Sequence, residues 1–446
     1  MKRKMRKREV SSYKDRSGFV FYKNGKVFRQ INGCYQENYR LLMSSGLYKS
    51  LVKKEMLIPH RDIRKGIIEA EKILFVSYPY EWCFSQLKAG ALLTLKIQKT
   101  AMDHGMSLKD ASAYNVQFVG TKPVFIDTLS FEKYKQGEAW VAYRQFCRHF
   151  LAPLVLMASV DGRLGRLLAI YLDGIPLDLA SRLLPIKSKF NFGTLSHIHL
   201  NARSQKMKTR GGKKHKLSRR LLTNLLTSLE TTVMNLEVKK SESEWGDYYK
   251  DTNYSTKAFA SKKSLVRRFL MKSRAKTVLD LGANTGEFGM IGAEMGAYVL
   301  STDYDWLAVE KNYKKWEGSE RLLPLTVDIT NPGAAIGWAN EERKSFWKRT
   351  KVDVVLALAL IHHLAISNNL PFEKIAKLIA GITEFLIIEF VPKTDSKVKI
   401  LLSQREDVFD DYGQKEFEGV FGKYFEIEES GPVVGSKRKI YLMKKR

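Results

Sequence analysis

The chain has 446 residues, of which 44% are hydrophobic and 11% aromatic, so it can bury substantial cores and does not belong to the disordered class. Its net charge of +29 predicts an anionic partner or acceptor, such as a nucleic acid, a nucleotide, a phospholipid or an acidic glycan. Apolar stretches are too short to span a bilayer, and none follows the basic N-terminus as in a signal peptide, so we expect a cytoplasmic protein. The oligomeric state is not predicted.

Three regions follow one another along the chain. Residues 1–200 mix helical and strand patterns and predict a separate N-terminal α+β domain. Residues 201–244 are a basic connector that continues into an amphipathic helix at 217–236. Residues 245–446 alternate strands and helices, which predicts an α/β domain. Two basic runs, at residues 2–8 and 203–220, are either solvated tails or phosphate-binding segments; the second holds nine Lys or Arg and no acid.

The N-terminal region carries a polar motif after a predicted helix at 92–104. Asp110 and Asn115 lie five residues apart, and Asp127 follows a short hairpin-like stretch. This spacing resembles the catalytic loop of protein-kinase-like phosphotransferases, which implies that Asp110 orients an acceptor hydroxyl while Asn115 and Asp127 hold Mg-nucleotide. The usual His is replaced by Leu108, and neither a glycine-rich loop nor a strand-three Lys is evident. The alternative is an Asx turn at Asp110 and a buried, hydrogen-bonded Asp127.

Metal binding is not predicted. The cysteines Cys34, Cys83 and Cys147 are far apart and form no CxxC pattern, which indicates a reducing compartment and no zinc ribbon. His197 and His199 alternate on a predicted strand and could share a metal, but no further ligands stand nearby in the sequence.

The C-terminal region contains short apolar runs that predict strands. We predict them at residues 277–281, 298–302, 323–327, 352–360 and 385–391, with a closing antiparallel pair at 426–429 and 439–443. Helices are predicted between them, for example at 288–295 and 307–316. The order predicts a Rossmann-like, mostly parallel, seven-stranded sheet.

A glycine-rich turn follows the first of these strands. Gly282 and Gly286 permit close approach of a ligand to the backbone at a helix start. The dinucleotide fingerprint would need Gly where Asn284 and Glu287 stand, so a pyrophosphate is not expected. About 20 residues later Asp303 ends the second strand, where a carboxylate can accept hydrogen bonds from ribose hydroxyls. Asp328 ends the third strand, where it can meet an adenine amino group.

These motifs resemble those of class I S-adenosylmethionine (SAM)-dependent methyltransferases. Residues 278–286 resemble the first motif, Asp303 the second, Asp328 the third and residues 352–364 the fourth. The resemblance implies SAM as cofactor, with the binding residues Asp280, Gly282, Ala283, Asn284, Gly286, Asp303, Asp328 and Leu358. In this fold the segment with Tyr248, Tyr249 and Tyr254 often folds over the cofactor. The alternative is a Rossmann-like domain with another ligand, or an inactive relative. The whole chain also resembles bacterial nodulation-related methyltransferases.

The motifs say less about the methyl acceptor than about the cofactor. The resemblance places the end of the fourth strand beside the methyl group, which makes His362 and His363 candidates for a general base or a substrate contact. The alternative is that one packs under the sheet and the other caps a helix. The region contains no cysteine and no Asn/Asp-Pro-Pro-Tyr/Phe motif, so we expect an O- or N-nucleophile as acceptor. Two alternative functions are considered for the whole chain. One is a bifunctional or kinase-like protein, and the other is a basic nucleic-acid-binding protein that uses the methyltransferase fold as a scaffold.

Overall fold

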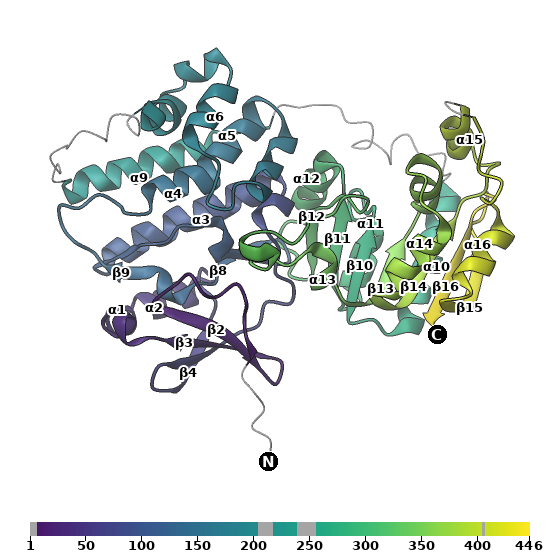
Figure 1. The fold of residues 1–446 in the computed structure, drawn as a ribbon, viewed down its shortest axis with the longest axis horizontal. Helices are drawn as coiled ribbons and strands as arrows, with labels where there is room; N and C mark the ends of the chain where they lie inside the picture. The colour runs from purple at the N-terminus through teal and green to yellow at the C-terminus, as the bar shows by residue number, and fades with distance from the viewer. Residues whose placement is uncertain (1–6, 204–216, 239–255, 404–405) are drawn as a thin grey trace. The chain divides into compact units, whose positions relative to one another are not determined.

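The computed structural model describes residues 7–203, 217–238, 256–403 and 406–446. The chain divides into two compact units (Figure 1): residues 1–119, 123–240 and 335–344 form unit 1, and residues 120–122, 241–334 and 345–446 form unit 2. Most of both basic runs and the three tyrosines at 248, 249 and 254 lie outside the described residues.

Unit 1 begins with an antiparallel sheet of five strands in the order β1-β2-β3-β5-β4. Its strands are β1 (Lys7–Arg8), β2 (Gly18–Lys23), β3 (Lys26–Ile31), β4 (His60–Arg64) and β5 (Ile67–Ala70). Two short helices, α1 (Gln36–Ser44) and α2 (Leu47–Lys53), lie between β3 and β4 in the chain. The buried ring of Tyr35 packs with Ile31, Ile68 and Leu129 and so joins this sheet to the segment that follows Asp127.

The rest of unit 1 is organised around the 20-residue helix α3 (Phe84–Asp103). Helix α9 (Arg219–Met234) packs against it and buries Leu222, Leu226 and Leu229, and Lys99 forms an ion pair with Glu230 at 2.5 Å. Two strand pairs follow α3: β6 (Met106–Leu108) with β9 (Phe131–Lys133), and β7 (Val116–Val119) with β8 (Lys122–Phe125). Further α-helices of unit 1 are α4 (Tyr143–Phe146), α5 (Ala152–Ser159), α6 (Leu177–Leu183) and α7 (Phe192–Thr194).

The prediction of a strand at His197 and His199 is wrong. Both lie in a π-helical turn, η8 (Leu195–Leu200), and both are buried. Hydroxyl groups engage both nitrogens of each ring: Tyr143 and Ser228 contact His197, and Ser181 and Ser188 contact His199. The two imidazoles therefore link neighbouring helices, and their spacing in the sequence reflects helix packing.

Unit 2 is built on a mixed sheet of seven strands in the order β12-β11-β10-β13-β14-β16-β15, so the α/β class and the strand number are confirmed. Its strands are β10 (Thr277–Leu281), β11 (Tyr298–Asp303), β12 (Leu322–Thr326), β13 (Val352–Ala357), β14 (Thr383–Phe390), β15 (Phe425–Pro432) and β16 (Lys439–Lys445). The first five pair in parallel, while β16 runs antiparallel to both β14 and β15. The chain order reverses between β10 and β13, and open α/β sheets bind ligands beside such a reversal.

Helices cover both faces of this sheet (Figure 1). On one face α10 (Thr256–Ser273) and α11 (Glu287–Glu294) bury Val266, Phe269 and Ile291 against the strands. On the other, α14 (Phe372–Ala380) and α16 (Gln414–Phe421) place Phe372 and Phe417 in an aromatic cluster with Phe390 and Tyr441. Ile440 belongs to the first core and its neighbour Tyr441 to the second, as expected for side chains that alternate along a strand. Three further helices are α12 (Trp306–Lys315), α13 (Phe346–Arg349) and α15 (Ser396–Ser403).

One strand boundary differs from the prediction. Strand β13 was expected to run to residue 360, but it ends at Ala357, and Ala359 adopts a positive φ of 51°. The apolar side chains continue past the strand because they line a cavity, which a pattern of apolar residues cannot distinguish from a buried strand. Separately, no helix in the described parts of the chain has the length and apolarity needed to cross a bilayer.

Candidate functional site

A cavity of about 440 Å³ opens at the carboxyl ends of the parallel strands of unit 2. This volume lies in the range of small-molecule sites. Its wall consists of the turn after β10, the ends of β11 and β12, the loop after β13 and one side of α10 and α15. Seven of the eight residues predicted to bind the cofactor line it: Asp280, Gly282, Ala283, Asn284, Asp303, Asp328 and Leu358.

The turn after β10 is held in shape by backbone and side-chain contacts. Gly282 and Asn284 have positive φ angles of 69° and 51°. The Asn284 amide donates to Asp303 Oδ2 at 2.8 Å, and the Asn312 side chain donates to the Asn284 carbonyl at 3.3 Å and to Ser301 Oγ at 2.8 Å. These bonds tie the turn to β11 and α12, so the backbone that faces the cavity is fixed before any ligand binds.

Gly286, the eighth predicted residue, does not line the cavity. Its φ of 78° starts α11, and a Cβ there would lie 2.5 Å from Asn312 Oδ1. Glycine is therefore required by the packing of the turn on Asn312 and by the left-handed backbone. Glu287, the next residue, points to Lys263 and Lys315, with which it forms ion pairs.

Carboxyl groups line one wall of the cavity. Asp280 and Asp303 are almost fully buried, and burial raises the pKa of Asp280 to about 7 and that of Asp303 to about 6. Backbone N–H groups oppose this effect: Gly289 donates to Asp280, and Asn284 and Asp305 donate to Asp303. Asp328 is half-buried and accepts from the Thr330 amide at 2.9 Å. A cation in the cavity would favour the ionised forms of Asp280 and Asp303.

A buried ion pair behind this wall escaped the sequence analysis. Lys262 of α10 lines the cavity, and its Nζ lies 2.6 Å from Oε2 of Glu389 at the end of β14. The same oxygen accepts from the Ala359 amide at 2.8 Å, which holds the turn after β13. Arg438 lies 3.8 Å from the other oxygen of Glu389 and forms a bidentate pair with Asp395. Lys262 occurs in a helix rich in Lys and Arg, so no local pattern distinguished it.

The two predicted histidines have different environments. His363 lines the cavity at the start of the turn η10 (His363–Ser367), and burial lowers its pKa to about 4. His362 is 1% exposed and is not part of the wall, and burial lowers its pKa well below the usual range. The rings lie 4.1 Å apart between centroids, and His363 disfavours the charged form of His362, while Arg438 disfavours that of His363. At neutral pH His363 is the neutral imidazole that faces the ligand space.

The kinase-like motif of unit 1 forms a polar cluster of its own. Asp110 accepts from the Gln145 side chain at 2.7 Å and from the Ser112 amide at 3.0 Å, so it forms the Asx turn considered above. The Asn115 side chain donates to Ser130 Oγ at 3.3 Å. Asp127 accepts from the Leu129 amide at 3.0 Å and from the Ser130 hydroxyl.

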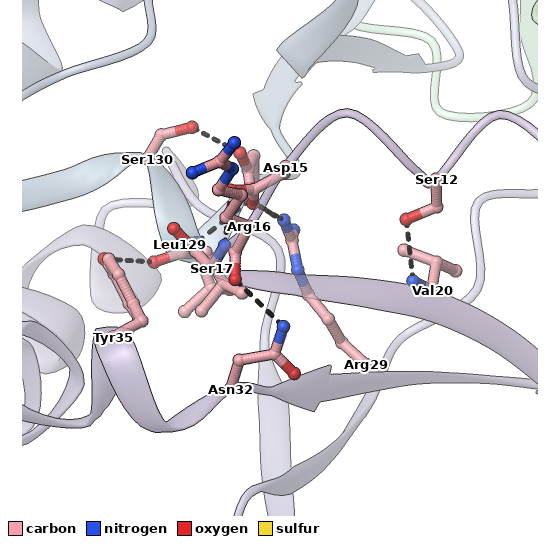
Figure 2. Close-up of polar contacts among 12 residues, drawn as sticks. Ser12, Asp15, Arg16, Ser17, Val20, Arg29, Asn32, Tyr35, Leu129 and Ser130 are labelled. Carbon is pink, nitrogen blue, oxygen red and sulfur yellow. Dashed lines mark hydrogen bonds and ion pairs between the residues drawn. The ribbon is translucent and has the colours of Figure 1, made fainter.

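An arginine from the first sheet completes this cluster. Figure 2 shows Arg29 of β3 reaching toward Asp15, whose carboxylate lies 3.3 Å away, and Arg29 also forms an ion pair with Asp127. Lys109 donates to Ser17 Oγ at 2.7 Å across the same space. Within the described residues no group of three or more His, Cys, Asp or Glu could hold a metal ion. The carboxylate of Asp127 is paired with the Arg29 guanidinium and accepts hydrogen bonds from neighbouring groups. This geometry favours a structural role for Asp127 over binding of Mg-nucleotide.

Comparison with known proteins gives one extensive relative. No family model matches the chain. It is 31% identical over 459 residues to the nodulation protein NoeA of Rhizobium meliloti (strain 1021), and the match covers 98% of this chain and 96% of that protein.

Similarities to solved structures are partial, with low TM-scores. Magnesium protoporphyrin IX methyltransferase of Synechocystis PCC 6803 with bound SAH is 18% identical, covering 45% of this chain and 92% of its own, with a TM-score of 0.34. The N-methyltransferase NodS of Bradyrhizobium japonicum WM9 is 10% identical, covering 43% and 98%, with a TM-score of 0.31. The bifunctional kinase-methyltransferase WbdD is 15% identical, covering 48% and 45%, with a TM-score of 0.30.

Proposed function

The chain belongs to the family of the nodulation protein NoeA, and we propose that its unit 2 is the catalytic domain of a SAM-dependent methyltransferase. The observation that carries this proposal is the cavity at the carboxyl edge of the sheet, with Asp280, Asp303 and Asp328 in its wall. When bound, SAM supplies an electrophilic methyl group on a sulfonium. The contribution of the chain is to bind and orient the two reactants and to accept a proton where the acceptor requires it.

The chemistry of the wall fits this cofactor. Asp303 lies at the end of β11, where its carboxylate would bind the ribose hydroxyls, and Asp328 would meet the adenine amino group. Asp280 would lie near the cationic ammonium and sulfonium groups, which explains why a buried carboxyl is tolerated there. Leu358 and Phe288 supply apolar surface between these polar groups.

Lys262 matches the remaining charged group. SAM carries a carboxylate beside its ammonium. Among the described residues that line the cavity, only Lys262 is a Lys or an Arg. Glu389 fixes its ammonium at 2.6 Å, so the charge is oriented before binding. Lys262 would therefore receive the carboxylate while Asp280 receives the ammonium.

The acceptor is proposed to be an O- or N-nucleophile. His363, Ser367 and Asn368 line the cavity in the loop and turn that follow β13, beyond the cofactor groups. A neutral His363 can accept a proton or a hydrogen bond from such an acceptor, whereas His362 is enclosed. The net charge of +29 favours an anionic acceptor, for example a nucleic acid, a nucleotide or a glycan.

Ligand-induced stabilisation tests the cofactor assignment directly. S-adenosylhomocysteine should raise the melting temperature of the full chain, and Asp303→Ala should abolish this shift. Asp353→Ala is the matched control, because Asp353 caps backbone amides of Lys276 and Thr277 and does not line the cavity. A shift that survives in a folded Asp303→Ala variant would contradict the assignment.

Labelled-methyl transfer to fractionated cell extract would then identify the acceptor class.

A further inference from the structure

Unit 1 exposes three large apolar side chains within one short segment. Ile186, Phe190 and Phe192 are 76%, 88% and 75% exposed, which places them among the most exposed large apolar side chains of the described residues. They lie within seven consecutive residues, in the 3-10 helix η7 (Ile186–Phe190) and at the start of α7. A single exposed apolar side chain is ordinary, but three together indicate a surface that meets a partner.

The backbone beneath the patch is firmly anchored. Ser188, on the buried side of η7, contacts His199 Nε2 at 2.9 Å. The Asn191 side chain accepts from the Thr194 amide at 2.9 Å and starts α7. Gly193 fits directly against α9, where a Cβ would lie 2.0 Å from Thr232 Oγ1. The outward direction of the apolar side chains is therefore set by packing on their opposite side.

Positive charge is interleaved with these apolar groups. Lys187 and Lys189 are exposed between Ile186 and Phe190, and neither forms an ion pair with any other residue whose structure is described. The sequence contains no Asp or Glu at all from residue 179 to residue 229. A partner of this surface must therefore be both apolar and anionic.

We propose that the segment of residues 186–192, the apolar–basic patch, docks on the anionic lipid surface of a membrane. Such a surface offers an apolar layer for Ile186, Phe190 and Phe192 immediately below a layer of phosphates for the two lysines. A single-stranded nucleic acid could stack on the two phenylalanines but would leave Ile186 exposed to water, so the observations favour the lipid surface. This inference concerns unit 1 alone and does not depend on the proposed methyl transfer.

Vesicle cosedimentation of the full chain tests the proposal. We expect binding to phosphatidylcholine vesicles that contain phosphatidylserine, and much weaker binding to phosphatidylcholine alone. The double variant Phe190→Ser/Phe192→Ser should lower the partition coefficient by about tenfold or more, because two aromatic rings no longer enter the interface. Lys187→Gln/Lys189→Gln should lower it by at least about tenfold on the anionic vesicles only.

The control is Trp338→Ser, which removes an aromatic side chain that is 77% exposed outside the patch and should leave binding unchanged. All variants change exposed side chains, so their melting temperatures should match that of the unsubstituted chain. Vesicle binding that is absent, or equal in the patch variants, would overturn the proposal. Binding of single-stranded RNA that is lost in the phenylalanine variant, without any vesicle binding, would reassign the patch to nucleic acid.

Discussion

Lys262 Nζ and Glu389 Oε2 lie 2.6 Å apart with both side chains buried, and this pair joins α10 to the end of β14. Glu389 also holds the Ala359 amide, so one carboxylate positions both a cavity-lining cation and the turn after β13. Burial lowers the pKa of Lys262, and the charge of Glu389 opposes that effect. Removal of either partner would leave the other charge without its closest counter-ion.

Glu389→Gln should therefore destabilise the protein by roughly 3 to 5 kcal/mol, measured as the free energy of unfolding in urea. The matched control is Glu294→Gln, which breaks the exposed pair of Glu294 with Arg267 at 2.9 Å and should cost less than about 1 kcal/mol. Equal losses of stability in the two variants would contradict the conclusion that the buried pair stabilises the fold.

Lys262→Met should in addition weaken S-adenosylhomocysteine binding.

In the unliganded protein, the stabilising contribution of Asp280 and Asp303 should be lost as the pH rises from about 4 to about 7. Burial raises the pKa of Asp280 to about 7 and that of Asp303 to about 6, above their ordinary value of 3.8. A carboxyl whose pKa is higher in the folded state favours folding most fully below its unfolded pKa, and this contribution disappears as the pH passes the folded pKa. Melting temperatures of the wild type and of Asp280→Asn across this range isolate the contribution of Asp280.

Cofactor binding should depend on pH in the opposite direction. A cationic ligand group favours the ionised carboxylates, so the thermal shift caused by S-adenosylhomocysteine should be larger at about pH 8 than at about pH 5. In Asp280→Asn the difference between the two pH values should shrink. A shift that is larger at the acidic pH would contradict the proposed place of the ammonium beside Asp280.

Gly286→Ala should destabilise the protein more than Gly296→Ala. Both glycines have positive φ angles, 78° and 92°, so each substitution pays a backbone cost of about 1 kcal/mol. Only at Gly286 does the new Cβ meet other atoms, 2.5 Å from Asn312 Oδ1, whereas the Cβ at position 296 has nothing within 4 Å. Urea unfolding should show an additional loss of about 1 to 3 kcal/mol at Gly286. Identical losses would contradict the packing of Asn312 on this turn.

Asp127→Asn should lower stability without changing any response to nucleotide. The substitution leaves Arg29, which is 14% exposed, with Asp15 as its remaining acidic partner, and should cost about 1.5 to 3 kcal/mol. Mg-ATP should shift the melting temperature of neither the wild type nor the variant. Stabilisation of the wild type alone would restore the kinase-like interpretation of Asp110, Asn115 and Asp127.

The regular part of unit 2 was predictable because strand and helix patterns are local. Predicted and observed strands agree within a few residues at β10, β11, β12 and β14. Seven of the eight predicted cofactor residues line one cavity, since motifs that end parallel strands converge at one edge of the sheet. Gly286 and residues 358–360 differed because local patterns do not reveal which neighbour a residue packs against.

The sequence by itself determined the order of the motifs along the chain, the glycine turn and the carboxylates at the strand ends. Each of these features depends only on residues that are close together in the sequence. Only the tertiary structure decided which side chains carry the site. It brought Lys262 to Glu389 across 127 positions, enclosed His362 while exposing His363 to the cavity, and set Arg29 against Asp127. Burial and ion pairing depend on residues far apart in sequence, and these interactions determine the charge and position of each group.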